Sequence, residues 1–432
     1  MEQNATRMCE LLVGLPDITV LGIVDAPDQP LEVHVECRDL DRRCVECGTS
    51  GRIKDRDSVE LVDLPCFGRP TLLVWRKHRL ACVNTACEIR SWTVQDSRIA
   101  SPRVRLTDRA GRWATEQVGR YARAINDVAV ELSTDWHTIS AAVVAYGEAL
   151  LDDDPDRIGT TTALGLDETL FVRLGRFRAK QWCTSIVDVA AGRLLDIVPG
   201  RTSTEACRWL ADQGSEWCSR IEWATLDLSG PYRAAFDTMT PDAVQVADQF
   251  HVIKLANTKL DEVRRRVQNQ TLGHRGHRDD PLYRARKLLV MAEERVIDAG
   301  GRERLLGLLD AGDPKGEVRT AWSAKELVRD LYSHRDPDVA LETVVQLAQD
   351  LQDRSCPPEI RQLGRTLGRW KHQIAAWHAS HLSNAPTEAA NNLVKRVKRG
   401  GFGFTKFRNY RVRVLLYAGR PNWSLLPAIT PR

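Results

Sequence analysis

The chain has 432 residues, of which 43% are hydrophobic and 28% charged. At about 100 to 200 residues per domain, this length predicts two to four domains with buried cores, and the composition excludes a disordered or fibrous protein. No stretch approaches the roughly 20 apolar residues that a membrane span needs, and the first residues, MEQNATRMCELLVGLPD, lack the apolar run of a secretory signal. We therefore expect a cytoplasmic protein without a membrane partner.

The net charge of +4 is small, but the charges are unevenly distributed along the chain. No Asp or Glu follows Glu388. The cations of this C-terminal segment are Lys395, Arg396, Lys398, Arg399, Lys406, Arg408, Arg411, Arg413, Arg420 and Arg432. An acid-free segment favours a polyanionic partner, most simply nucleic acid, and a solvated basic face without a ligand is the alternative.

Hydrophobic patterning divides the chain into successive segments. Three short β-branched runs between Thr162 and Val198, followed by strands that alternate with helices, predict an α/β layered domain with a mixed sheet. Further on, Leu282, Ala285 and Leu289 repeat at helical spacing and the strand signal disappears. The expected segments are 1–40, a small N-terminal element; 41–97, a cysteine-containing module; 101–150, a helical segment; 160–275, the first part of the α/β domain; 276–380, an all-helical insertion; and 381–432, the second part of the α/β domain with the basic segment.

Four of the 11 cysteines form two close pairs, Cys44 with Cys47 and Cys82 with Cys87. A stretch with strand character, Thr71 to Val74, lies between the pairs. This spacing predicts one structural, tetrahedral Zn²⁺ site that stabilises a small module. Buried cysteines without metal, or a redox pair in the first motif, are the alternatives. Two further cysteines lie nearby and could replace one of the ligands: Cys37 and Cys66.

Residues 125–143, INDVAVELSTDWHTISAAV, predict two short helices joined by a tight turn at Ser133-Thr134, which could also cap the second helix. Apolar residues repeat at helical spacing in both helices: Val128, Ala129 and Leu132 in the first, Trp136, Ile139 and Val143 in the second. This arrangement resembles a helix-turn-helix, whose second helix would present Trp136, His137 and Ser140 to DNA. Two helices that pack together without binding DNA are the alternative.

Three carboxylates occupy unlike places in the pattern. Asp167 lies inside the predicted strand LGLDETLFV, Asp227 ends the predicted strand IEWATLDLSG, and Glu388 lies in SNAPTE before a helix. Carboxylates in apolar strands are unfavourable unless they are paired or bound to metal. Adjacent strands could bring the two aspartates together with Glu388 as a third ligand, leaving positions on Mg²⁺ open for water and phosphate. The alternative is that each acid marks a strand end.

The order of these motifs is also informative. Cysteine pairs, a helix-turn-helix, GLDE, LDLSGPY, ADQFHV and SNAPTEAANNLVKRVKRGGFGFTKFRNYRVRVLL follow one another between Cys44 and Leu416. This order resembles the DDE transposases of bacterial insertion sequences, and specifically the ISL-three family. The resemblance implies a multidomain protein with an N-terminal four-cysteine zinc-binding module, a helix-turn-helix DNA-binding domain, and an α/β ribonuclease-H-like catalytic domain that the helical insertion interrupts.

The resemblance further implies that Asp167, Asp227 and Glu388 form the DDE triad and hold two Mg²⁺ (or Mn²⁺) ions, without a nucleotide cofactor. Two such ions would activate an attacking oxygen and stabilise a leaving one at a phosphodiester.

Three further acidic or basic residues lie close to this triad in the sequence. Asp248 and His251 of ADQFHV would lie beside the metal site, and Asp248 is the rival of Asp227 for the second catalytic position. Glu168 would point to the opposite face of a regular strand, and we leave it out of the predicted site.

The basic C-terminal segment would track the DNA backbone beside the metal ions. The predicted DNA contacts are Asn391, Asn392, Lys395, Lys398, Arg399, Lys406, Arg408, Arg411 and Arg413. Arg411 and Arg413 alternate with two valines, which predicts one apolar and one phosphate-facing side. The glycines of GGFGF predict a tight turn, and its aromatic residues could either pack or stack on bases.

These features predict a transposase that binds the terminal inverted repeats of an insertion sequence, cleaves DNA to expose 3′ hydroxyls and joins them to target DNA. Its partner would be double-stranded DNA, at the element ends and at the target, bound by a homodimer or a larger assembly. The alternatives are a DNA-binding repressor, an inactive transposase derivative, and a metal-dependent nuclease without strand transfer.

Overall fold

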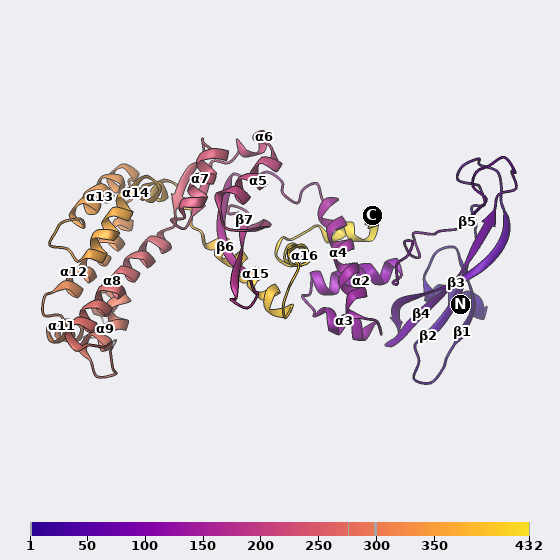
Figure 1. Ribbon diagram of the computed structural model, residues 1–432, viewed down its shortest axis with the longest axis horizontal. Coiled ribbons are helices and arrows are strands. Elements are labelled where there is room, and N and C mark those ends of the chain that lie inside the picture. Colours follow the sequence, from indigo (N-terminus) through magenta and orange to yellow (C-terminus); the bar gives the residue numbers. More distant parts are fainter. Residues whose placement is uncertain (1, 275, 298–299, 432) are drawn as a thin grey trace. The chain divides into compact units, whose positions relative to one another are not determined.

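The computed structural model describes residues 2–274, 276–297 and 300–431, so that Arg432 of the basic segment lies outside it (Figure 1). The chain divides into two compact units, one formed by Met1–Gly159 together with Leu393–Arg432, the other by Thr160–Asn392. No described helix is long and apolar enough to cross a membrane.

The first unit begins with a five-stranded sheet of order β1-β2-β4-β3, with β5 paired to β4. The elements are α1 (Ala5–Val13), β1 (Ile18–Val24), β2 (Leu31–Cys37), β3 (Arg52–Cys66), β4 (Arg69–Ala81) and β5 (Ser91–Thr93). Val33 and Val35 of β2 are buried against Leu73 and Trp75 of β4 in one core. Residues 1–40 are therefore not a separate element, because β1 and β2 belong to the same sheet as β3 and β4.

Helices complete the first unit: α2 (Asp108–Gly119), α3 (Ile125–Glu131), α4 (Trp136–Asp152), α16 (Phe407–Ala418) and η2 (Trp423–Ala428). Between α3 and α4, Ser133 has a φ of 52°, the left-handed conformation that favours glycine. The side chain of Asp135, and not Ser133 or Thr134, caps α4 by accepting a hydrogen bond from the Thr138 amide. In α16 three successive residues, Val412 to Val414, are buried, so the alternation predicted for this segment is wrong: it is a helix.

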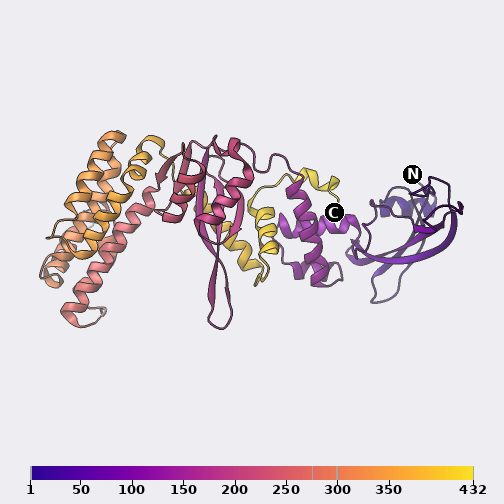
Figure 2. The same cartoon turned by 45° about the horizontal axis from the view of Figure 1, so that its top comes forward.

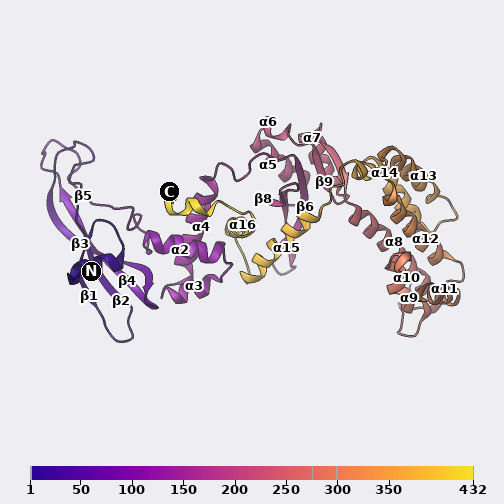
Figure 3. The same ribbon diagram turned by 180° about the vertical axis from the view of Figure 1, so that it is seen from behind.

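The second unit contains a mixed sheet of order β10-β9-β6-β7-β8 (Figures 1 and 3). Its strands are β6 (Ala163–Leu174), β7 (Ala179–Asp188), β8 (Arg193–Pro199), β9 (Trp223–Leu226) and β10 (Val244–Ala247), with connecting helices α5 (Ser203–Gln213), α6 (Ser215–Cys218) and α7 (Gly230–Met239). The first three strands are antiparallel to one another, whereas β6 with β9 and β9 with β10 are parallel. The α/β layering with a mixed sheet agrees with the pattern in the sequence.

After β10 the described residues of the second unit are helical. The helices are α8 (Gln249–Leu272), α9 (Pro281–Val290), α10 (Glu293–Ile297), α11 (Gly301–Gly312), α12 (Glu317–Asp330), η1 (Leu331–Ser333), α13 (Pro337–Asp350) and α14 (Pro358–Ser380). Helix α15 (Ala385–Gly400) follows, and the boundary between the two units, after Asn392, falls within it. The predicted apolar stripe is buried at Leu282, Ala285 and Leu289. The helical stretch starts before residue 276, at Gln249, and α14 leads back to the sheet by contacting β10.

Candidate functional site

Three carboxylates gather where β6 passes the end of β9. Asp167, Glu168 and Asp227 each offer an oxygen within 4.8 Å of the others. The parallel register pairs Gly165 with Thr225, so that Asp227, two residues further on, lies level with Asp167. The pairing of these two strands thus brings the predicted aspartates side by side.

Glu168 belongs to this cluster, although a regular strand predicts it on the face opposite Asp167. Adjacent residues of a strand do point to opposite faces. Asp167 contacts Asn391 of α15, whereas Glu168 lies near the Tyr232 hydroxyl of α7. Strand β7 pairs with β6 at both residues, but β9 ends at Leu226 and does not cover the other edge of β6 at this level. The longer glutamate side chain can therefore reach the same space as Asp227. Asp167 and Glu168 thus do point to opposite faces of β6, but the end of β9 lets both carboxylates reach the same space.

The electrostatics of the cluster favour a bound cation. Burial, and then repulsion from Asp167, raise the pKa of Asp227 above its usual value. Burial, Asp227 and Asp167 likewise raise the pKa of Glu168. One oxygen of Asp227, Oδ1, is buried without a hydrogen-bond partner. Oxygen ligands on three clustered carboxylates suit Mg²⁺ or Mn²⁺, so the residues present fit the metal that the sequence predicts.

Helix α15 is held close to this cluster by its first turns. A Cβ at Gly165 would lie 2.4 Å from the Thr387 hydroxyl oxygen, so only glycine at this point of GLDE permits the approach of α15 to β6. The amide of Asn391 donates to Asp167 Oδ2 at 2.7 Å. Glu388 is one helical turn before Asn391, and its carboxylate oxygen lies 3.5 Å from His251 Nε2. Glu388 is therefore next to the site, but it is not one of the three clustered carboxylates.

Asp248 and His251 connect Glu388 to the aspartates. Asp248 follows β10, is 3% exposed, and accepts from His251 Nδ1 at 3.0 Å. Asp248 raises the pKa of His251, with smaller contributions from Asp227 and Glu388. The imidazole thus lies among three carboxylates, while Asp227, and not Asp248, shares the cluster with Asp167.

Three of the predicted DNA contacts are buried, and this corrects their predicted role. Asn391 is 2% exposed because its side-chain oxygen accepts from the Thr169 and Ser185 hydroxyls. Ser140 is 7% exposed within α4. Arg413 is 6% exposed, its guanidinium lies 5.3 Å from the centre of the Phe404 ring, and burial lowers its pKa to about 10.

The other predicted DNA contacts retain exposure. Trp136 and His137 at the start of α4 are exposed. In the C-terminal segment, Lys398 and Arg411 are half-buried, Arg408 pairs with Glu148 of α4, and the remaining residues are exposed: Asn392, Lys395, Arg399 and Lys406.

The two aromatic residues of GGFGF behave differently. Phe404 packs against Tyr410, with ring centres 5.0 Å apart, whereas Phe402 is 93% exposed. Packing therefore holds for Phe404, whereas stacking on bases stays a prediction for the accessible ring of Phe402.

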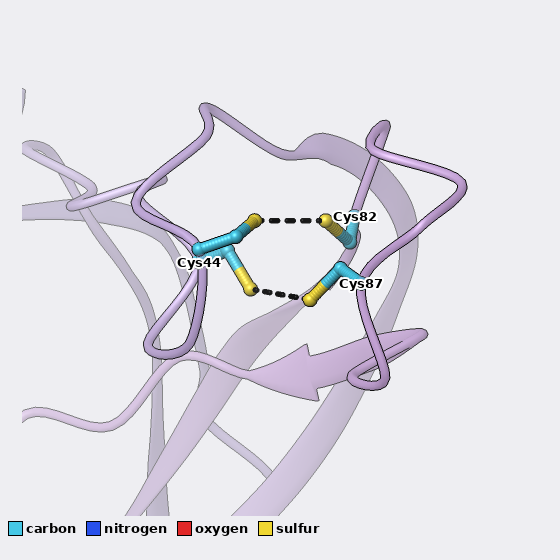
Figure 4. A group of neighbouring side chains, drawn as sticks. Cys44, Cys82 and Cys87 are labelled. Carbon is cyan, nitrogen blue, oxygen red and sulfur yellow. Dashed lines mark hydrogen bonds between the residues drawn. The ribbon is translucent and has the colours of Figure 1, made fainter.

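The cysteine pairs meet at one end of the long β3–β4 ribbon (Figure 4). Arg52 at the start of β3 pairs with Ala81 at the end of β4, so the loops that precede and follow these strands are neighbours. Cys44 Sγ lies 3.8 Å from Cys87 Sγ, and the other two sulfur atoms are 3.6 Å apart. Sulfur atoms about 2.3 Å from a tetrahedral zinc ion would be about 3.8 Å apart, whereas a disulfide needs about 2.05 Å. The four thiols therefore fit a zinc ion and not two disulfides.

Cys37 and Cys66 lie away from these thiols. Cys37 is buried in the core of the sheet. Cys66 pairs with Arg69 at the turn of the β3–β4 ribbon, opposite the end that carries the cluster. The structure thus selects the four predicted ligands from the six cysteines in this part of the sequence.

Comparison with known proteins identifies the family. A family model described as Transposase, that of the ISL3 (ISL-three) DDE transposases, matches residues 164–414, more than half of the chain. The chain belongs to this family, which confirms the resemblance in its motifs.

Two relatives extend the similarity beyond that segment. The chain is 23% identical over 383 residues to the transposase for insertion sequence element IS1001 of Bordetella parapertussis, across 88% of this chain and 89% of the relative. It is 24% identical over 398 residues to the transposase for insertion sequence element IS1557 of Mycobacterium tuberculosis, across 84% and 82%.

Proposed function

We propose that the protein is an active DDE transposase that cleaves the ends of its insertion sequence and joins them to target DNA. The observation that carries this proposal is the carboxylate cluster of Asp167, Glu168 and Asp227 beside Glu388. A mixed sheet of three antiparallel strands continued by two parallel ones, with acids at the junction, is the arrangement expected of a ribonuclease-H-like catalytic domain. Residues 276–380 are then a helical insertion in that domain.

Asp167 and Asp227 would hold the catalytic Mg²⁺ or Mn²⁺ ions, with Glu388 completing the triad. When bound, such ions activate an attacking oxygen and stabilise the leaving oxygen of a phosphodiester. Asn391 fixes the Asp167 carboxylate by donating to its Oδ2 atom, and Asp248 orients the His251 ring through Nδ1. His251 in turn positions Glu388 on the first turn of α15.

Glu168 has a different surrounding from the triad. It shares the space of the two aspartates from the opposite face of β6. Burial and the neighbouring aspartates raise the pKa of Glu168, which favours a retained proton on this carboxyl when no metal is bound. We propose that Glu168 is a further metal ligand or a proton acceptor at this site.

DNA would be recognised mainly by the first unit. The exposed Trp136 and His137 start α4, the position at which the second helix of a helix-turn-helix meets a groove. The four cysteines would bind one structural Zn²⁺ ion and order the loops that flank the β3–β4 ribbon. Because two element ends are joined in one reaction, we propose that a homodimer or a larger assembly forms on DNA.

A cleavage assay tests this function. Full-length protein is incubated with Mg²⁺ and a labelled fragment that carries one end of the element, and 3′ ends and joined products are resolved on gels. Asp167→Asn and Glu388→Gln should lower cleavage by more than roughly 100-fold and keep DNA binding, since even outer partners of metal ligands are worth 10- to 100-fold. Asp212→Asn, the same charge change at an exposed position of α5, is the matched control.

The outcomes separate the alternatives. Binding without cleavage by the wild type, unchanged in Asp167→Asn, would leave a repressor or an inactive derivative. Cleavage that never yields products joined to a target plasmid would indicate a nuclease without strand transfer.

A further inference from the structure

The β6–β7 hairpin extends beyond the rest of its sheet as a free two-stranded ribbon (Figure 2). Strand β9 pairs with β6 only as far as Gly165, and β8 pairs with β7 only from Cys183 onward. Between these points, Val172 to Leu174 pair with Ala179 to Gln181 and with no other described strand. Residues 173–181 are all exposed.

The composition of this ribbon is unusual for an exposed hairpin. No acid occurs between Glu168 and Asp188, whereas the tip carries four cations: Arg173, Arg176, Arg178 and Lys180. Between two of the cations, Phe177 is 92% exposed.

The pairing of the ribbon is also electrostatically unfavourable by itself. Arg173 lies directly opposite Lys180, and like charges in such a pair destabilise a hairpin. No carboxylate forms a salt bridge with any of the four cations among the described residues. Charge complementarity therefore points to an anionic partner that covers the whole tip, and an unpartnered aromatic ring between the cations points to one that also offers flat apolar faces.

The base of the ribbon is the carboxylate cluster, because Asp167 and Glu168 lie on the same strand. At about 3.3 Å per residue, the seven residues from Asp167 to Leu174 place the tip about 23 Å from the cluster. A two-stranded ribbon fits the major groove of DNA, and aromatic side chains stack on unpaired bases. The width of a two-stranded ribbon and its length of about 23 Å both suit a duplex whose scissile phosphodiester lies at the carboxylates.

We propose that the β6–β7 ribbon docks in a groove of the DNA next to the cleavage position, with its cations on phosphates and Phe177 against a base. This inference rests on the proposed function, because it takes DNA as the substrate of the carboxylate site. It assigns DNA contacts to the ribbon in addition to those predicted for the basic C-terminal segment and the helix-turn-helix.

The cations are tested by Arg176→Gln combined with Arg178→Gln. Affinity for an element-end duplex is measured by fluorescence anisotropy over a range of salt concentrations. Each lost phosphate contact lowers the slope of log K against log salt by about 0.9, so the double variant should lower it by about 2 and weaken binding. The control is Lys315→Gln combined with Arg354→Gln, which removes two exposed cations from the helical part of the same unit.

The position of the contacts is tested by ethylation interference. Phosphates that matter to the wild type but not to the double variant should lie within about 7 base pairs of the cleaved bond, since 23 Å corresponds to about that length at 3.4 Å per base pair. Phe177→Ala should reduce affinity by about 5- to 100-fold for a substrate with an unpaired base there, the range expected for one stacked base.

Because the substitutions lie at an exposed tip, thermal unfolding and zinc content should match those of the wild type. If the wild type cleaves DNA and the ribbon variants bind with the affinity and salt slope of the control, the ribbon inference is overturned while the proposed function stands. If the variants lose only self-association, measured by sedimentation without DNA, the ribbon is instead a protein interface and the inference again fails. A wild type that neither binds nor cleaves the end fragment refutes the proposed function itself.

Discussion

Replacing Asp227 with asparagine should make the metal-free protein more stable and abolish its stabilisation by Mg²⁺. Two charges 4.8 Å apart, the limit within which the clustered oxygens lie, repel by about 3 kcal/mol at an effective dielectric constant of 20. Asp227 experiences this repulsion from both Asp167 and Glu168. Burial, and then this repulsion, raise the pKa values of Asp227 and Glu168, and part of the repulsion is relieved when a carboxyl group keeps a proton.

We therefore expect a net gain of about 2 kcal/mol in the variant without Mg²⁺, or about 4 to 8 °C in the unfolding temperature of a unit of this size. The buried Oδ1 atom of Asp227 has no hydrogen-bond partner, so asparagine loses no contact there. In the wild type, Mg²⁺ at 100 times its dissociation constant should stabilise by about 2.7 kcal/mol, and the order of the two proteins should then reverse.

Scanning calorimetry of the full-length chain with and without Mg²⁺ measures both effects. No chelator is added, because it would also remove zinc from the cysteines. Asp212→Asn should stay within about 0.5 kcal/mol of the wild type under both conditions, as expected for an exposed site. A variant at Asp227 that is less stable than the wild type without Mg²⁺, or that gains as much from Mg²⁺, would refute the electrostatic account of the site.

Two further predictions concern the cysteines and α15. The purified protein should contain about one zinc per chain by mass spectrometry. The double variant Cys44→Ser with Cys47→Ser should lose this zinc, whereas the control Cys66→Ser at the ribbon turn should keep it. A zinc-free wild type would contradict the assignment. Asn391→Leu should lower the free energy of unfolding by roughly 2 to 4 kcal/mol in urea titrations, because the buried Thr169 and Ser185 hydroxyls and the half-buried Asp167 carboxylate each lose a hydrogen bond. The exposed Asn392→Ala should change it little. If Asn391→Leu left the free energy of unfolding unchanged but weakened DNA binding, Asn391 would be a DNA contact as predicted from the sequence, despite its burial.

Local patterns were sufficient to predict the strands and helices of the second unit, but not where the ends of its strands fall relative to one another. The three runs between Thr162 and Val198 are the antiparallel strands β6, β7 and β8 because β-branched residues and turns repeat locally. Residues 1–40 show no clear period and predict only a small element, and only the pairing between β2 and β4 shows that they belong to the cysteine-containing sheet. Such parallel pairing joins residues far apart in the sequence and leaves no local signal.

The lack of a local signal for contacts between distant residues also explains why the candidate site was predicted only in part. Asp167 and Asp227 could be predicted because each is a charged residue in or after an apolar strand. Glu168 could not, because its inclusion depends on where the neighbouring strand β9 stops. The position of Asn391 one helical turn after Glu388 predicts a DNA contact, whereas its burial follows from the hydroxyls of β6 and β7, which only the folded sheet brings to it.

Helix α15 offers a physical reason why the acid-free segment directly follows Glu388, the acid proposed to complete the triad. At 100° per residue, Asn392, Lys395 and Arg399 fall within about 40° of Glu388, on one stripe of the helix, and all three are exposed. The stripe rises 1.5 Å per residue, so its two cations lie roughly 10 and 16 Å beyond Glu388. Asn391 and Val394, beside the stripe, are buried. A DNA strand with its scissile phosphate at Glu388 would therefore meet cations at its next phosphates, and a carboxylate anywhere on the stripe would repel it.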